Sequence, residues 1–314
     1  MVANKRKILV TGATGQQGGA LARLLLQKKH EVYALIRSTK SESPKAQNLR
    51  NQGAKLVEAD LDKPDSLEQA TSGIDSVFLM GTPVEVGTEG EIRRGKMMVD
   101  IAKEKKIEHI VYSSVVNADK NTGILAFESK YKVEQHIKNS GIPYTIIGPT
   151  FFMGNLLSYP LGQQGQVALP LSPSRILGLQ QGQVALPLSP SRILQQSAVE
   201  NIAEFSALAL ERRNSFIGKR IDIASDEITG EQAAKVLSNE LGRKIRYEQV
   251  PMEQIRQASE DLAVMYEWFE RIGTGVDVAA LHKQYPEVNW LTFKDWVKSQ
   301  NWGDLASSPT NSET

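Results

Sequence analysis

Three glycines stand at a spacing that suits the binding of a dinucleotide. Gly12, Gly15 and Gly18 lie in the stretch TGATGQQGG, directly after an apolar run that ends at Thr11. In such a loop the first glycine permits a tight turn, the second lets the backbone approach a pyrophosphate, and the third lets a helix pack closely on the sheet. The N–H groups and positive dipole end of that helix would face the phosphates. Because the stretch follows a strand pattern and opens a helical one, it predicts a phosphate-binding loop rather than a merely structural turn.

The end of the second strand pattern indicates which cofactor is preferred. An NAD-selective site usually places an acidic residue here to bind the ribose hydroxyls. This chain has Arg37, followed by Lys40, and no acidic residue before Glu42. A guanidinium can bind a 2′-phosphate through two hydrogen bonds. We therefore predict NADP(H) in preference to NAD(H); the alternative is that Arg37 is an ordinary surface residue.

Two further strand ends would flank such a cofactor. Asp60 and Leu61 follow the third strand pattern, where the adenine is expected. Gly81, Thr82 and Pro83 end the fourth, along the expected course of the dinucleotide. In both places a plain strand-end turn or loop is the alternative.

These loops require a parallel sheet to position them. From residue 7 to about residue 148, apolar runs typical of strands alternate with helical patterns. Such alternation forms βαβ units around a parallel sheet that is buried on both faces and binds ligands at the carboxyl ends of its strands. We predict an α/β fold with a doubly wound, parallel-sheet Rossmann domain over residues 1–150. Its six strands are expected at Lys7–Thr11, Glu31–Ile36, Ala54–Ala59, Ser76–Met80, His109–Ser114 and Tyr144–Gly148.

The second half of the chain has a different pattern. Residues 151–302 are predicted to form a smaller α+β lobe that covers the cofactor cleft, and residues 303–314 a disordered tail. Helices are expected at Val199–Arg213, Glu231–Gly242, Met252 to about Ile272 and Leu291–Gln300, the last with Thr292 as its N-cap, and a strand at Gly218–Ala224.

A segment of the second half is repeated. The stretch QQGQVALPLSPSRIL occurs at Gln163–Leu177 and again at Gln180–Leu194, identical over fifteen residues at a spacing of seventeen. Two copies are too few for a solenoid, so we interpret residues 161–194 as a local duplication, natural or artificial. Only one copy can occupy the position that the flanking sequences define. We expect the other as an exposed excursion, because long loop insertions cost little; the alternative is that both copies pair as an added hairpin.

Composition excludes several classes of function. A net charge of +1 gives no electrostatic footprint for nucleic acid or an anionic membrane surface. Without cysteines the chain has no disulfide, zinc–thiolate site or catalytic thiol, and its four histidines are too dispersed to predict a metal site. No apolar run approaches the roughly 18 residues of a membrane helix, so a cytoplasmic protein is expected.

Several stretches together resemble the NmrA-like family, atypical relatives of the short-chain dehydrogenases. The resemblance rests on TGATGQQGG, the strand end at Arg37, YSSV, SKYKVEQHI, PTFFMGNLL and LTFKDWV, and it extends to about residue 300. It implies an NADP-binding, doubly wound domain with a small C-terminal lobe. The family includes both redox enzymes that act on quinones or dyes and non-enzymatic regulators that sense the cofactor.

The resemblance also implies roles for individual residues. Phosphate-loop positions of the family match Gly12, Thr14, Gly15, Gln16, Gln17 and Gly18. Arg37 matches the 2′-phosphate contact, and Lys130 matches the catalytic lysine that reaches the nicotinamide ribose. Phe152 and Asn155 match the segment across the nicotinamide. The chain departs from the dehydrogenase pattern at Ala126, four residues before Lys130, where such enzymes carry a tyrosine that donates a proton.

The missing tyrosine limits the chemistry that can be expected. Ala126 and its neighbour Phe127 share the face of Lys130 if the helix extends that far, and neither is an acid; Tyr131 is turned about 100° away. Hydride transfer from NADPH then suits acceptors with a stable product anion, such as quinones, better than simple ketones. A cofactor-sensing protein with a regulatory protein partner is the second hypothesis. Ser113 and Ser114 could bind a substrate carbonyl or local backbone, and Lys130 could instead form a surface salt bridge with Glu134.

Overall fold

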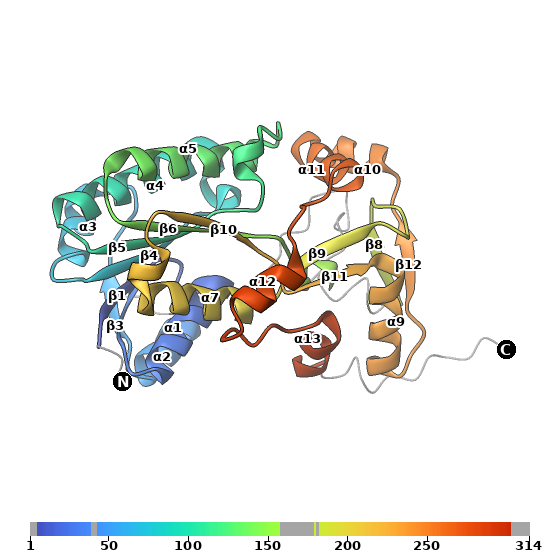
Figure 1. Ribbon diagram of the computed structural model, residues 1–314, viewed down its shortest axis with the longest axis horizontal. Coiled ribbons are helices and arrows are strands. Elements are labelled where there is room, and N and C mark those ends of the chain that lie inside the picture. The colour runs from blue at the N-terminus through green and yellow to red at the C-terminus, as the bar shows by residue number, and fades with distance from the viewer. Residues whose placement is uncertain (1–4, 39–42, 158–178, 180–181, 303–314) are drawn as a thin grey trace. The chain divides into compact units, whose positions relative to one another are not determined.

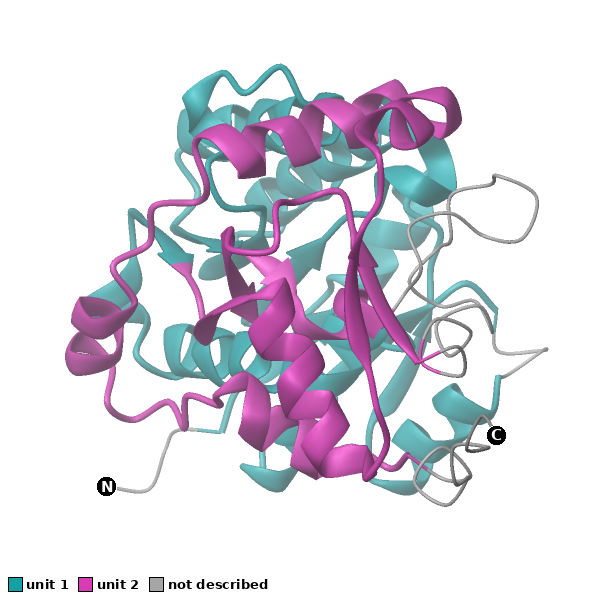
Figure 2. Ribbon diagram, turned by 90° about the vertical axis from the view of Figure 1, so that its right-hand side faces the viewer, with its two compact units in different colours: residues 1–149, 199–222 teal, residues 150–198, 223–314 magenta. Residues whose placement is uncertain are grey.

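The computed structural model describes residues 5–38, 43–157, 179 and 182–302. The chain divides into two compact units, one of residues 1–149 and 199–222 and the other of residues 150–198 and 223–314 (Figure 2). The sequence predicts one lobe over residues 151–302, whereas residues 199–222 belong to the first unit. Lys40 and the tail 303–314 lie outside the described residues.

The first unit is built on a seven-stranded sheet in the order β10-β6-β5-β4-β1-β2-β3. The pairs of the first six strands are parallel, and their order is that of a doubly wound nucleotide-binding fold. This confirms the predicted fold class. The strands are β1 (Lys7–Val10), β2 (Glu31–Ile36), β3 (Lys55–Glu58), β4 (Ser76–Met80), β5 (His109–Ser113), β6 (Tyr144–Pro149) and β10 (Lys219–Ile223).

Helices cover both faces of this sheet (Figure 1). Helices α4 and α5 pack together on one face, and α1 packs with α7 on the other. The helices of the unit are α1 (Gln16–Gln27), α2 (Pro44–Asn51), α3 (Pro64–Ala70), α4 (Pro83–Glu104), α5 (Leu125–Ser140), α7 (Val199–Glu211) and α8 (Arg213–Phe216), with a short 3-10 helix η1 (Ala118–Lys120). Because α7 buries its apolar side against α1, it belongs to the first unit and not to the second.

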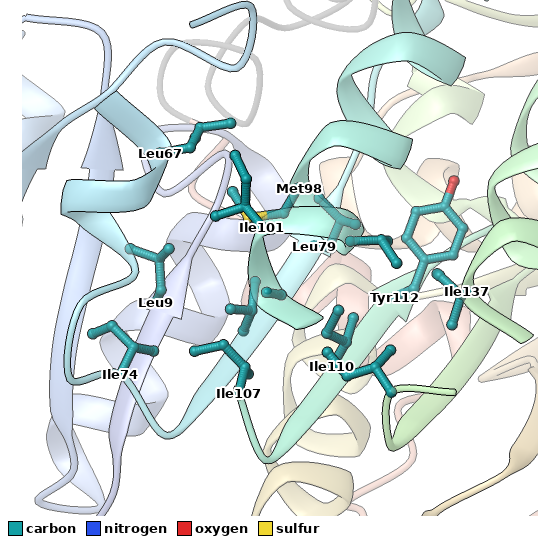
Figure 3. Packing of buried hydrophobic residues seen from close by; sticks show 14 of the residues in the cluster. Leu9, Leu67, Ile74, Leu79, Met98, Ile101, Ile107, Ile110, Tyr112 and Ile137 are labelled. Carbon is teal, nitrogen blue, oxygen red and sulfur yellow. The ribbon is translucent and has the colours of Figure 1, made fainter. Parts of the chain in front are cut away.

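The core of the first unit lies between the sheet and helices α3 to α5. Leu9, Leu79, Ile110 and Tyr112 from the strands meet Met98 and other residues of the helices in one buried cluster (Figure 3). Strands buried on both faces are expected to be near-continuous apolar runs, and β4 and β5 are. The cluster makes the sheet a rigid support for the loops at the carboxyl ends of its strands.

The second unit contains a three-stranded and a two-stranded sheet. Strand β9 (Ile193–Ser197) lies between β7 (Phe151–Phe152) and β11 (Asp226–Thr229), and β8 (Gln183–Leu186) pairs in parallel with β12 (Arg246–Gln249). Five α-helices of the described residues accompany them: α9 (Gly230–Leu241), α10 (Met252–Ala258), α11 (Glu260–Arg271), α12 (Val278–Gln284) and α13 (Phe293–Ser299), with the 3-10 helix η2 (Met153–Leu157).

Two helix predictions for this unit have different outcomes. The single helix expected from Met252 to about Ile272 is wrong, because Ser259 adopts an extended φ of −163° and caps α11 by accepting a hydrogen bond from Leu262 N. The predicted N-cap Thr292 is confirmed, since its side chain accepts a hydrogen bond from Asp295 N at the start of α13.

The second copy of the duplicated stretch supplies β8 and the beginning of β9. Most of its apolar side chains, among them Val184, Leu186, Leu188 and Leu194, are buried. The first copy, Gln163–Leu177, lies outside the described residues. Because the second copy forms these strands, the chain continues directly from Leu194 into the rest of β9, which pairs with β11 from Ile193 to Gln196. If the first copy formed them instead, the second copy would interrupt β9 after its second residue.

Candidate functional site

The glycine loop has the geometry that a phosphate-binding loop requires. Gly12 has a φ of +61°, and Gly15 N donates a 2.8 Å hydrogen bond to Gly12 O, which closes the turn after β1. A Cβ atom on Gly18 would lie 2.4 Å from Gly12 O, so only glycine allows α1 to approach the strand this closely. Gly15 is the N-cap of α1 and no side chain caps the helix. The first-turn N–H groups therefore have no side-chain acceptor and suit an anion.

Side chains of this loop differ in their contacts. Gln17 Oε1 accepts a 2.7 Å hydrogen bond from Ser113 Oγ at the end of β5, which ties α1 to the neighbouring strand end. Thr14 and Gln16 are half-buried and make no side-chain hydrogen bond to another described residue. Ser113 is thus engaged by a side chain rather than by local backbone.

Arg37 follows β2 and is exposed. Its guanidinium has no ion pair or hydrogen bond with any residue that the structure describes. A guanidinium, with its five N–H donors, suits a phosphate ester at this strand end. The contact with the 2′-phosphate remains a prediction, as does the role of Lys40.

Asp60 and Leu61 form a strand-end turn after β3. Asp60 Oδ1 accepts a hydrogen bond from Asp62 N, and Leu61 packs against the core cluster. Next to them, Arg94 and then Arg93 of α4 donate hydrogen bonds to Asp62 and lower the pKa of its carboxyl group to about 2. The predicted contact of Asp60 and Leu61 with an adenine stays a prediction.

Gly81, Thr82 and Pro83 connect β4 to α4. Thr82 is the N-cap of α4, without a side-chain hydrogen bond, and Pro83 is its first residue. A Cβ atom on Gly81 would lie 2.7 Å from Glu91 Oε1, so glycine is needed here because a buried carboxylate lies against it.

That carboxylate is the partner of Lys130. Lys130 Nζ lies 2.6 Å from Glu91 Oε1 and donates a 3.2 Å hydrogen bond to Gly81 O. The side chain of Glu91 is 1% exposed and that of Lys130 is 13% exposed. Ser129 Oγ donates a 2.5 Å hydrogen bond to Glu91 Oε2. The ammonium group is thereby fixed at the carboxyl end of β4.

The alternative salt bridge of Lys130 with Glu134 is wrong. Glu134 is 0% exposed and binds Arg220 Nε of β10 at 3.0 Å, while Ser114 Oγ donates to its Oε1 at 2.5 Å. Arg220 also donates to Val115 O, 2.9 Å away, and pairs with Asp222. This buried network fixes the segment after β5. Burial raises the pKa of Asp222 although Arg220 opposes that shift.

Glu91 and Arg220 are functional residues that were not predicted from the sequence patterns. A signal for Glu91 was present, since it precedes Gly95 by four residues and Met98 by seven and therefore lies on the buried face of α4. A carboxylate on an otherwise apolar face needs a buried partner. No comparable local signal indicates the buried contacts of Arg220, because Glu134 and Val115 are 86 and 105 residues away along the chain and only Asp222 is near in sequence.

Neither Tyr131 nor Tyr112, two described tyrosines of the first unit, lies where it could replace the acid missing at Ala126. Helix α5 begins at Leu125, so Ala126 is indeed one turn before Lys130, and Phe127 beside it is buried. Tyr131 lies under Lys138, whose Nζ is 5.7 Å from the ring centroid. Tyr112 is fully buried in the core, and burial raises the pKa of its phenol well above the ordinary value.

Phe152 and Asn155 belong to the second unit. Phe152 lies in β7 and pairs with Ser197 of β9. Asn155 is in η2, and its Oδ1 atom is buried without a hydrogen-bond partner among the described residues. A buried acceptor without a donor is costly in a folded protein, which makes it a candidate for binding a ligand.

These features fit a dinucleotide at the carboxyl ends of the strands of the first unit. The close approach at Gly18, the start of α1 without a side-chain cap and the exposed guanidinium of Arg37 suit phosphate groups, and Lys130 offers a fixed donor. Within the described residues, no helix is both long and apolar enough to cross a membrane.

Comparisons with known proteins agree with this architecture. Residues 4–297 match the model of the NmrA-like family. The NAD(P)H azoreductase of Xenophilus azovorans is 26% identical over 253 residues, which cover 80% of this chain and 79% of that protein.

Two solved structures share the fold. An NADPH-dependent quinone oxidoreductase from Escherichia coli, complexed with NADPH, is 21% identical with a TM-score of 0.73, covering 92% of this chain and 98% of that one. NmrA, a negative transcriptional regulator in complex with NADP, is 18% identical with a TM-score of 0.72, covering 94% of this chain and 95% of that one. With the family model matching nearly its whole length, the chain belongs to the NmrA-like family.

Proposed function

We propose that this protein is an NADPH-dependent oxidoreductase that transfers hydride to a quinone-like acceptor without a tyrosine acid. The proposal rests on two neighbouring features of α5: Lys130 holds its ammonium group in a fixed position, and the residue one helical turn earlier is the apolar Ala126. The relatives named as an azoreductase and a quinone oxidoreductase support the reaction class.

Different residues of the first unit bind different parts of the cofactor. The glycine loop and the start of α1 hold the pyrophosphate, and Arg37 binds the 2′-phosphate. Lys130 donates a hydrogen bond to a hydroxyl group of the nicotinamide ribose and so orients the ring. When bound, NADPH would supply a hydride, which is one proton with two electrons.

The acceptor class follows from the proton balance. A quinone that receives hydride becomes a hydroquinone monoanion, whose charge is stable in water until a solvent proton completes the hydroquinone. A ketone would become an alkoxide, which needs a positioned acid in the transition state; such acids contribute about 10²–10⁴-fold to the rate. Ala126 supplies none.

The test follows the absorbance of NADPH after mixing with the protein and a quinone. We expect NADPH to be oxidised, and Lys130→Met should lower the rate strongly. The control is Lys132→Met, which replaces an exposed lysine on the same helix and should leave the rate unchanged. Equal affinity for NADPH and NADH would contradict the assignment of Arg37. Equal loss of activity in both lysine variants would contradict the role of Lys130.

A cofactor-sensing protein is the second candidate, favoured by the same missing acid and by the regulator NmrA among the structures of this fold. Its partner would be a regulatory protein rather than a hydrophobic acceptor. Tight binding of NADPH without turnover of any quinone or dye would favour this function.

A further inference from the structure

Lys130 uses only part of its capacity to donate hydrogen bonds. An ammonium group has three N–H donors. Two are directed to Glu91 Oε1 and to Gly81 O, and the third has no acceptor among the described residues. Because two directions are fixed by buried or backbone acceptors, the direction of the third is fixed as well.

Glu91 is in turn held on both of its oxygen atoms. Oε1 binds Lys130 and Oε2 accepts from Ser129 Oγ, which lies next to Lys130 in α5. The carboxylate also lies where a side chain on Gly81 would be, since a Cβ atom there would be 2.7 Å away. Helix α4, helix α5 and the end of β4 therefore meet around this one group.

Stability alone does not account for the arrangement. Two charges taken out of water lose solvation energy that their attraction often fails to recover, and apolar residues of similar size are frequently as good. The neighbouring buried face of α4 carries Met98 and Val99, so an apolar residue at position 91 would suit the fold. What an apolar residue cannot do is orient an ammonium group.

We propose that Glu91, supported by Ser129, is a positioning residue that directs the third N–H of Lys130 to a hydroxyl oxygen of the nicotinamide ribose. The inference rests on the proposed function, because it requires a bound nicotinamide cofactor. Glu91 itself touches neither cofactor nor substrate and acts through Lys130. Loss of the carboxylate leaves the ammonium free to rotate away from the ribose.

The test compares two ligands. NADPH carries the nicotinamide ribose, whereas adenosine 2′,5′-bisphosphate carries only the adenine half of the cofactor. We expect Glu91→Gln to weaken binding of NADPH about tenfold, as for the loss of a hydrogen bond to a charged group, and to leave the bisphosphate affinity within twofold. Glu89→Gln, an exposed glutamate on the same helix, is the matched control and should change neither affinity.

A double substitution tests that Glu91 acts through Lys130. Lys130→Met should weaken NADPH binding, and adding Glu91→Gln to it should cause no further loss. Unchanged NADPH affinity in Glu91→Gln would overturn the inference, as would an equal loss for both ligands, which indicates a general structural effect. Failure of the unmodified protein to bind NADPH would instead refute the proposed function.

Discussion

The buried pair of Arg220 and Glu134 gives a prediction whose size follows from the structure. Arg220 Nε lies 3.0 Å from Oε2 and 3.2 Å from Oε1 of Glu134, a residue that is 0% exposed. Arg220→Met leaves the carboxylate with Ser114 Oγ at 2.5 Å and Lys138 Nζ at 3.4 Å. Removing one partner of a buried ion pair costs about 3–5 kcal/mol, and because two donors remain we expect a loss near 3 kcal/mol.

The free energy of unfolding can be measured in urea by far-UV circular dichroism. Tryptophan fluorescence is unsuitable, because all four tryptophans lie in residues 223–314 and therefore report on the second unit. Lys219→Met, an exposed neighbour on β10, is the control and should cost less than about 0.5 kcal/mol.

A double-mutant cycle separates the ion pair from other contacts of Arg220. In a chain that also carries Glu134→Met, Arg220→Met should cost about 2 kcal/mol less than it does alone, since the buried carboxylate of Glu134 is then no longer left without Arg220. A loss below about 1 kcal/mol in the single variant, or additive losses in the double variant, would refute the reasoning.

Three further outcomes are expected. Burial, with smaller contributions from the charges of Arg213 and Arg6, lowers the pKa of His109 to about 3. An unfolded histidine gains its proton near pH 6.5, so the contribution of neutral His109 to the free energy of unfolding is present above that pH and is lost as pH falls towards 3. The expected loss between pH 6.5 and 5 is about 2 kcal/mol. His109→Asn should flatten this pH dependence of the free energy of unfolding measured in urea, and an unchanged dependence would contradict the prediction. Deleting Leu161–Leu177 should leave the melting temperature and NADPH affinity nearly unchanged, and loss of soluble protein would contradict the seating of the second copy. The buried Tyr112 hydroxyl has no hydrogen-bond partner among the described residues, so Tyr112→Phe should stabilise the protein by up to about 1 kcal/mol; a clear loss in urea unfolding would indicate a partner.

Local patterns predicted much of the fold. Residues 7–148 show the periodicity of strands and helices, and the turns between these elements lie at the predicted places. The three-glycine loop forms the expected turn because Gly12 can adopt the positive φ that the turn requires. The break at Ser259 was missed although a serine before Glu260 and Asp261 is a usual N-cap signal. The apolar period continues across Ser259 and concealed it.

Contacts distant in sequence could not be predicted in the same way. Residues 199–222 carry an ordinary helix and strand pattern, and nothing in it shows that α7 packs on α1 or that β10 extends the first sheet. Lys130 has Glu134 at helical spacing, yet its partner is Glu91, 39 residues away. The choice depends on which side of α5 faces α4, and this is set by tertiary packing.

The most direct test of the proposed chemistry compares two acceptors under identical conditions. The protein is mixed with NADPH and either a quinone or a simple ketone of similar size, and NADPH oxidation is followed by absorbance. Because Ala126 supplies no acid, we expect turnover of the quinone and a rate at least about 10²-fold lower for the ketone. Comparable rates for the two acceptors would contradict it, because a proton donor would then have to be present.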